Sequence, residues 1–315
     1  MGEHWKAEQI PSQAGKRFLI TGANSGIGFH AALKLARKGA EVILACRDRR
    51  KGEAAMSRLR EEAPGAQAEL AILDLASLDS IRAFATEELA RNRPLHVLIN
   101  NAGIMAVPRR TETVDGFEMQ FGTNVLGHFA LTGLLLPELE RTASNSQEPP
   151  RIVTIASLAH KRTHLDLDDL QSFKTYSPLR TYQQSKLANL MLAFELSRRL
   201  GASSSKILSV AAHPGIASTA IFRTDERSGT ARALRTLVGH AIGIFLNTDA
   251  EGALPTLFAA TSTEAVDGRY YGPEGLGEMR GDTVGVAKVG SQARDEIAAS
   301  RLWQRCEDLT GIHYL

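Results

Sequence analysis

The chain has little cysteine and no long apolar run, and both shortages exclude whole classes of protein. Cys46 and Cys306 are the only cysteines in 315 residues, too few for a disulfide framework and in keeping with a reducing compartment. Residues 1–6 lack the apolar stretch of a signal peptide. No run approaches the roughly 18 apolar residues that a membrane span requires. We therefore expect a cytoplasmic protein without a transmembrane segment.

The chain also carries little excess charge. Its 37 Lys and Arg residues and 35 Asp and Glu residues leave a formal net charge of +2, which implies no general attraction to nucleic acid. The nine histidines form no metal-binding pattern such as H-E-x-x-H. His160 and His164 stand four residues apart, but their polar surroundings favour a solvated loop. We expect no metal and no nucleic-acid partner, while a homo-oligomer remains compatible with the sequence.

Apolar residues are plentiful, at 43% of the chain, and they alternate between strand-like and helical patterns. Strand-like runs cover residues 17–20, 41–45, 68–73, 95–99, 151–156, 207–212 and 269–271. Helical patterns cover residues 29–36, 77–92, 114–137, 180–200, 249–261 and 291–309, and residues 142–150 are typical of a surface connection. This alternation predicts an α/β fold, with a doubly wound, mostly parallel seven-stranded sheet covered by helices on both faces.

A glycine-rich turn, Gly22-Ala23-Asn24-Ser25-Gly26-Ile27-Gly28, separates the first strand-like run from the first helical pattern. Glycine permits a tight turn and close backbone approach, and a helix N-terminus presents free N–H groups to a pyrophosphate. The spacing is G-x-x-x-G-x-G, not the commoner G-x-G-x-x-G, and alone it also fits an ordinary glycine-rich loop. Within the alternating pattern it predicts a single Rossmann-type domain over residues 15–315, after an N-terminal tail of residues 1–14.

Arg47 follows the second strand-like run, where dinucleotide-binding folds contact the adenosine ribose. An acidic residue at that distance from the glycines binds the ribose 2′-OH, whereas an arginine suits a 2′-phosphate. Asp48 lies almost as close, and the alternative is that these charges begin a solvated helix. We favour NADP(H) over NAD(H).

Tyr182-Gln183-Gln184-Ser185-Lys186 places a phenol and an ammonium on one helix face, since residues four apart are neighbours. The nearby cation would favour the phenolate and lower the tyrosine pKa from about 10. Such a group suits proton transfer near neutral pH. Alone, the pattern is also common on solvated helices.

Together these motifs resemble the short-chain dehydrogenase/reductase family, over about residues 15–310. The resemblance is carried by six motifs in order: residues 21–28, Asn100-Asn101-Ala102-Gly103, Asn124, Ser157, the Tyr182–Lys186 pair and Pro214-Gly215-Ile216. It implies Asn124, Ser157, Tyr182 and Lys186 as the catalytic group. The enzyme would interconvert a carbonyl and an alcohol by hydride transfer, with Tyr182 as acid or base and Ser157 bonded to the same oxygen.

The resemblance also implies cofactor contacts along the chain. Asp74 and Leu75 would border the adenine, and Asn101, Ala102 and Gly103 would line the ribose side. Gly22, Asn24, Ser25, Gly26, Ile27 and Gly28 would hold the phosphates, and Arg47 the 2′-phosphate. Tyr182, Lys186, Pro214, Gly215 and Ile216 would contact the nicotinamide end, while Asn124 would hold a water beside Lys186.

Finer patterns are similar to the retinol dehydrogenase, protochlorophyllide reductase and WW-domain oxidoreductase branch. They include Phe121-Gly122-Thr123-Asn124-Val125-Leu126-Gly127-His128-Phe129 and the Leu187-Ala188-Asn189 that follows Lys186. Many animal members of this branch carry an N-terminal anchor or WW modules, which this sequence does not show. We expect a lipophilic ketone, aldehyde or alcohol as the substrate.

Two other functions are alternatives to the carbonyl/alcohol oxidoreductase. A sugar-nucleotide epimerase or dehydratase would typically carry G-x-x-G-x-x-G, which the observed glycine spacing disfavours. A catalytically weak NADP(H)-binding redox sensor or scaffold would have an eroded catalytic set, whereas all four residues are present.

Residues 217–247 are expected to form a lid over the substrate. The apolar positions Leu234, Leu237, Val238, Ala241, Ile242 and Phe245 repeat at helical spacing. The alternatives are that this face packs on the core, or that a basic amphipathic helix contacts a membrane surface.

Overall fold

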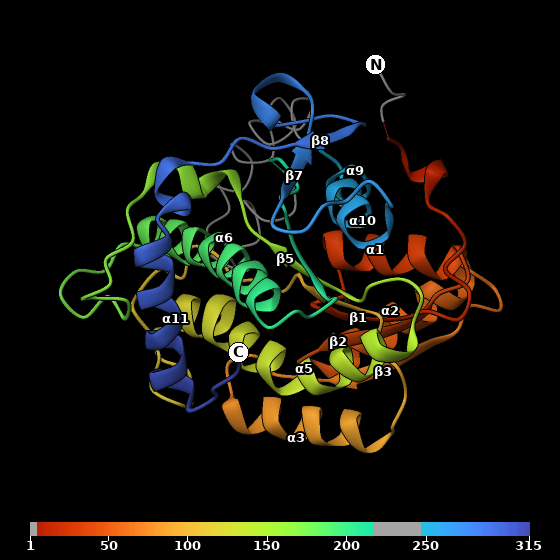
Figure 1. The fold of residues 1–315 in the computed structure, drawn as a ribbon, viewed down its shortest axis with the longest axis horizontal. Helices are drawn as coiled ribbons and strands as arrows, with labels where there is room; N and C mark the ends of the chain where they lie inside the picture. The colour runs from red at the N-terminus through yellow and green to blue at the C-terminus, as the bar shows by residue number, and fades with distance from the viewer. Residues whose placement is uncertain (1–4, 217–246) are drawn as a thin grey trace, which may run out of the picture.

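An eight-stranded sheet runs through the middle of the protein, with strand order β3-β2-β1-β4-β5-β6-β7-β8 (Figure 1). The computed structural model describes residues 5–216 and 247–315. Neighbouring strands from β3 to β7 pair in parallel, and β8 pairs antiparallel with β7. The strands are β1 (Arg17–Thr21), β2 (Glu41–Cys46), β3 (Ala68–Ile72), β4 (Val97–Asn100), β5 (Arg151–Ile155), β6 (Leu208–Ala212), β7 (Tyr270–Pro273) and β8 (Val284–Val286). This is the order of a Rossmann fold, which confirms the predicted fold class.

Helices cover both faces of the sheet, as Figure 1 shows, because every central strand is apolar on both sides. Along β1, Phe18 and Ile20 join one core cluster and Leu19 joins the other. The longer helices are α1 (Gly26–Arg37), α2 (Arg49–Glu62), α3 (Leu78–Ala90), α5 (Gly127–Asn145), α6 (Pro178–Ala202), α10 (Leu254–Thr261) and α11 (Glu296–Thr310). Helices α1, α2 and α10 pack on the first cluster, and α3, α5, α6 and α11 on the second.

Short elements connect these helices and strands, and side chains mark where several helices begin. The short elements are η1 (Ala7–Gln9), α4 (Met119–Phe121), η2 (Gly122–Leu126), η3 (Leu158–Arg162), α9 (Asp249–Gly252), η4 (Leu276–Glu278) and η5 (Ser291–Arg294). Ser77, Ser177 and Asp295 cap α3, α6 and α11 by accepting a bond from a first-turn backbone N–H.

The sheet has one strand more than the seven predicted. Strand β8 covers only three residues, with Gly285 in the middle, and Val286 is 66% exposed. Such a strand is too short and too open to show a strand pattern in sequence. It forms because β7 offers it an edge to pair with.

The helical pattern at residues 114–137 does not match one helix. Helical structure begins at Met119, passes through a π-helical turn, and continues as α5 to Asn145 despite Pro137 inside it. The expected surface connection at residues 142–150 therefore starts later. Buried Thr142 explains the extension, because its hydroxyl donates to the Glu138 carbonyl and accepts from the backbone of Leu95. Tertiary packing here overrides the local sequence signal.

The segment before β1 lies against the domain. The buried ring of Trp5 packs edge-on against Phe258 at 5.3 Å between ring centroids, and its backbone pairs with Val284. The expected lid at residues 217–247 falls almost entirely outside the described residues. Within residues 5–216 and 247–315, no helix has both the length and the apolar character to cross a bilayer.

A buried arginine joins the strands at one end of the sheet. The Arg17 side chain is 2% exposed and pairs with Glu41 at 3.1 Å, with Glu69 at 2.5 Å and with buried Glu88. Burial by itself would lower the pKa of Arg17, but the carboxylates of Glu88 and Glu69 reverse that effect and raise it. The cluster therefore holds the first three strands and α3 in fixed register.

We predict that Arg17→Met destabilises the protein by about 3–5 kcal/mol, because it leaves the buried carboxylate of Glu88 without its close cation. The free energy of unfolding from denaturant titration measures this loss. Lys51→Met is the control, since the Lys51–Asp48 pair is exposed and should contribute at most about 1 kcal/mol. Equal small losses in both variants would show that the buried cluster contributes nothing special.

Candidate active site

A groove of about 330 Å³ lies where the carboxyl ends of the strands meet the N-terminus of α1. Twelve residues predicted to bind the cofactor line this groove: Gly22, Asn24, Ser25, Gly26, Ile27, Gly28, Arg47, Asp74, Leu75, Asn101, Ala102 and Gly103. Ligands of doubly wound folds bind at this edge of the sheet. The structure thus brings together residues that are up to 81 positions apart in sequence.

The glycine turn has no room for a side chain at Gly22 or Gly28. A β-carbon on Gly28 would lie 2.5 Å from Asn101 Nδ2 and 2.7 Å from the Gly22 carbonyl oxygen. Gly22 has φ +69° and would meet Ala102 at 3.0 Å. Helix α1 begins at Gly26, and its N-cap residue Ser25 makes no side-chain hydrogen bond to the first turn. A cradle of backbone with an uncapped helix end fits the pyrophosphate of a dinucleotide.

Thr21 joins the glycine turn to the segment after β4. Its hydroxyl oxygen accepts from the backbone N–H groups of Asn101 and Ala102, both at 2.9 Å. In return, Asn101 Nδ2 donates to the Thr21 carbonyl at 2.7 Å. These bonds fix the two sides of the groove relative to each other.

The structure separates the roles of Arg47 and Asp48. Arg47 lines the groove with an exposed side chain. Asp48 caps α2 instead, because its carboxylate accepts from the Lys51 backbone N–H at 3.0 Å. The alternative that Asp48 begins a helix is therefore confirmed for that residue.

Lys186 is buried at the far end of the groove, with 4% of its surface exposed. Its Nζ donates to the Ile155 carbonyl oxygen at 2.9 Å. A β-carbon on Gly103 would lie 3.4 Å from both Lys186 Nζ and Asn124 Oδ1, so these two groups border the same point. Burial lowers the pKa of Lys186 to about 8.

The pKa of Tyr182 departs from expectation. Burial raises it above its ordinary value, although a hydrogen bond with the Ser157 side chain acts in the opposite direction. Lys186 Nζ lies 6.0 Å from the centre of the Tyr182 ring. The expected lowering by Lys186 is not seen at that distance, and loss of hydration is the largest influence on this pKa.

Asn124 is fully buried and held on both ends of its amide. Its Oδ1 accepts from Ile104 N at 2.8 Å, and its Nδ2 donates to Ile104 O and to Ser185 Oγ, both at 3.0 Å. It lies in the π-helical turn Gly122–Leu126, a type of distortion that often marks functional positions.

Ser157 follows β5 and caps the short helix η3. The expected solvated loop is wrong for His160 in that helix, because its ring is only 1% exposed. His160 Nδ1 donates to the Ser157 carbonyl at 2.6 Å, and its Nε2 accepts from Gly290 N at 3.1 Å. The expectation holds for His164, which is exposed.

The predicted turn at residues 214–216 leaves β6 on the same side of the sheet. Asn247 fixes it by donating from Nδ2 to the Pro214 carbonyl and from its backbone N–H to the Ile216 carbonyl, at 2.8 and 2.9 Å. A β-carbon on Gly252 would lie 3.4 Å from Pro214 and 3.3 Å from Ile27. The turn therefore lies beside the start of α1.

His128 was missed as a site residue by sequence reasoning. Its Nδ1 bonds to the Asn124 carbonyl at 3.0 Å and its Nε2 to the Thr21 hydroxyl at 2.9 Å. Because a carbonyl only accepts, Nδ1 carries the proton and Nε2 accepts from Thr21. This buried imidazole ties the catalytic asparagine candidate to the cofactor groove. The only available signal was its place in the Gly127-His128-Phe129 pattern.

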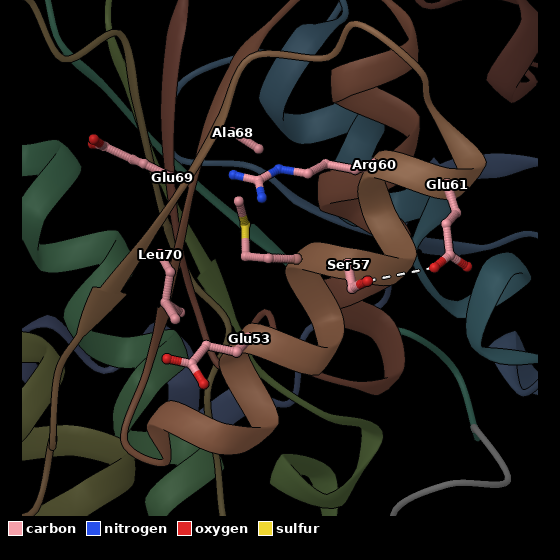
Figure 2. A pocket seen from close by; sticks show the side chains of 8 residues that line it. Glu53, Ser57, Arg60, Glu61, Ala68, Glu69 and Leu70 are labelled. Carbon is pink, nitrogen blue, oxygen red and sulfur yellow. Dashed lines mark hydrogen bonds between the residues drawn. The ribbon is translucent and has the colours of Figure 1, made fainter.

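A larger hollow, about 620 Å³, lies between α2 and edge strand β3 (Figure 2). Glu53, Ser57, Arg60 and Glu61 reach it from α2, and Glu69 and Leu70 from β3. It contains none of the predicted site residues. Within residues 5–216 and 247–315, no three His, Cys, Asp or Glu side chains gather as metal ligands.

Comparisons with known proteins agree with this geometry. The family model for short chain dehydrogenases matches residues 16–228. Human retinol dehydrogenase 13 is 41% identical over 308 residues, covering 96% of this chain and 87% of the relative. Mouse retinol dehydrogenase 14 is 41% identical over 310 residues, with 95% and 86% covered.

Solved structures show the same fold. An uncharacterised protein from Mycobacterium paratuberculosis is 41% identical, with a TM-score of 0.79 and 99% of both chains covered. A protein from Beutenbergia cavernae described as an NAD(P)-dependent gluconate 5-dehydrogenase, with NADP bound at low occupancy, is 26% identical. Its TM-score is 0.60, with coverage of 82% of this chain and 95% of that one.

We predict that His128 makes stability depend on pH. Burial lowers its pKa to about 4 from the ordinary 6.5. Between these two pH values the unfolded state binds a proton on His128 and the folded state does not. Stability should therefore fall as pH drops from about 6.5 towards 4, by up to about 3 kcal/mol from this residue. Denaturant titrations of His128→Gln should show a shallower fall than the wild type. His164→Gln, at an exposed position, should keep the wild-type slope; an unchanged slope in His128→Gln would contradict the prediction.

Proposed function

The chain belongs to the short-chain dehydrogenase/reductase family, in the retinol dehydrogenase branch, and from this we propose an NADP(H)-dependent enzyme with Tyr182 as acid and base. Membership of the family makes it an oxidoreductase of carbonyl and alcohol groups. The proposal adds the cofactor preference, the residues that act and the class of substrate.

One observation carries the proposal: four polar groups converge at the end of the cofactor groove. The Ser157 side chain lies close enough to Tyr182 to lower its pKa against the effect of burial, and Lys186 and Asn124 border the same point at Gly103. Burying a lysine beside a tyrosine reduces the stability of the fold. Groups with shifted pKa values, such as this lysine, cluster at functional sites.

The groove fits a dinucleotide with its nicotinamide end towards Tyr182. Gly22, Gly26 and Gly28 would hold the pyrophosphate, and residues 214–216 would border the nicotinamide. When bound, the nicotinamide supplies the hydride that the protein's own side chains cannot provide.

The side chains of the site would transfer the proton and stabilise the charge that develops on the carbonyl oxygen. In the reductive direction, the Tyr182 hydroxyl would donate its proton to the carbonyl oxygen, while Ser157 would hydrogen-bond the same oxygen and stabilise its developing charge. The ammonium of Lys186 would favour the phenolate left on Tyr182. Asn124, fixed by Ile104, would hold a water beside Lys186 through which the proton is replaced.

The preference for NADP(H) is supported by Arg47. It is exposed in the groove, while the carboxylate of neighbouring Asp48 is engaged as a helix cap and does not compete for the ribose.

A lipophilic substrate is supported by the relatives named retinol dehydrogenases, because retinol is a long apolar primary alcohol.

Two buried free thiols, Cys46 and Cys306, favour a reducing compartment and hence the cytoplasm.

Consumption of NADPH against aldehydes and ketones graded by size and polarity tests the activity. We expect turnover to rise with the apolar length of the substrate. Absence of turnover with every compound, in a protein that binds NADPH, would favour a redox sensor or scaffold instead.

We predict that Tyr182→Phe keeps the fold and binds NADPH but loses at least about a hundredfold in kcat, because the proton donor is gone. Single-turnover measurement of NADPH oxidation gives this loss. Tyr271→Phe is the matched control, since Tyr271 packs against Phe258 away from the groove and should leave kcat nearly unchanged. A Tyr182→Phe enzyme as fast as the wild type would disprove the assignment.

We predict that Arg47→Asp weakens NADPH binding about tenfold or more and NADH binding less. A charge-assisted hydrogen bond contributes about 1.5–3 kcal/mol, and the new carboxylate would also repel the 2′-phosphate. Fluorescence titration with both cofactors measures the two affinities. Arg50→Asp changes the charge equally at an exposed position outside the groove and should affect both little. Equal losses for both cofactors in Arg47→Asp would exclude recognition of the 2′-phosphate by this residue.

A further inference from the structure

A small cavity of about 30 Å³ lies in the core between the sheet and helices α5, α6 and α11. Its lining mixes apolar side chains such as Val125 and Leu196 with several polar ones. It shares no lining residue with the cofactor groove described above.

Three side chains that line this cavity carry buried polar atoms without a hydrogen-bond partner among residues 5–216 and 247–315. They are Asn100 Oδ1 at the end of β4, Asn189 Nδ2 on α6 and Trp303 Nε1 on α11. Their residues are 4%, 3% and 1% exposed, respectively. Buried polar groups are seldom left unpaired, and three in one cavity indicate a shared ligand.

The donors and acceptors are complementary to water. Asn100 Nδ2 already donates to Thr132 Oγ1 at 2.9 Å, which leaves Oδ1 as the free acceptor of that amide. Asn189 Nδ2 and Trp303 Nε1 can only donate. One water molecule would accept from these two groups and donate to Asn100 Oδ1, which satisfies all three.

The size of the cavity supports the same ligand. A buried water molecule needs about 10–15 Å³ of space open to its centre and two to four polar partners. The cavity exceeds that requirement and is far smaller than the roughly 300 Å³ or more of a typical organic-ligand pocket.

We propose that this cavity is a binding site for one water molecule that joins β4, the catalytic helix α6 and the C-terminal helix α11. Asn189 stands three residues after Lys186 and seven after Tyr182, so the three share one face of α6. The water therefore holds α11 to the same helix face that carries the proposed acid and base. The site does not depend on the proposed enzymatic function.

Nuclear magnetic resonance of the full chain, labelled with ¹⁵N in tryptophan, tests the site. The chain has two tryptophans, so Trp303→Phe identifies the Trp303 indole signal by its loss. We expect a cross peak between the Trp303 Hε1 proton and water with the sign of through-space transfer in a rotating-frame experiment. A missing peak, or one with the sign of chemical exchange only, would overturn the proposal.

A pair of substitutions tests whether the water bridges the helices. Asn189→Leu removes the donor while keeping the side-chain size, and should abolish the water cross peak at Trp303. Asn145→Leu makes the same change at an exposed position at the end of α5, and should keep the peak. A peak that persists in a folded Asn189→Leu protein would refute the bridge, and the wild-type measurement decides the matter if that variant does not fold.

Discussion

The burial of one ammonium group, that of Lys186, is the constraint on which the candidate site depends. The group donates to the backbone carbonyl of Ile155, not to a carboxylate, and burial lowers its pKa to about 8. Taking a charge out of water costs stability unless the charged group is hydrogen-bonded or paired, so its acceptor has to be held in place. The neighbouring elements do fix it: α6 supplies the lysine, β5 its acceptor, and the π-helical turn the adjacent Asn124.

The parallel sheet makes this arrangement possible. Because its strands point the same way, the segments after β1, β4, β5 and β6 all emerge at one edge, and short polar bonds then join them. Thr21 is bonded to Asn101, Ala102 and His128, and His128 is bonded to Asn124. The glycine turn, the cofactor groove and the candidate catalytic group are therefore parts of one hydrogen-bonded unit.

The buried ion pairs and the cations near the groove lie in different parts of the protein. The buried Arg17 cluster joins the first three strands and α3 away from the groove, with carboxylates from Glu41, Glu69 and Glu88. The exposed cation Arg47 lines the groove, and the buried ammonium of Lys186 borders it at Gly103. Structural ion pairs and candidate functional cations thus occupy different parts of the same sheet.

The candidate catalytic residues came from the resemblance to the short-chain dehydrogenase/reductase family. The sequence by itself determined the glycine turn and most of the alternation of strands and helices, because these depend on local periodicity and on spacing along the chain. It could not determine β8, the extension of α5 to Asn145 or the burial of His160, since each depends on a partner distant in sequence: β7, Leu95 and Gly290. The pKa of Tyr182 belongs to the same group. Spacing put a cation near the phenol, but only the folded structure set the 6.0 Å separation between Lys186 Nζ and the Tyr182 ring and the burial that raises the tyrosine pKa. Local pattern fixes which elements form, whereas desolvation and long-range hydrogen bonds exist only once those elements have packed.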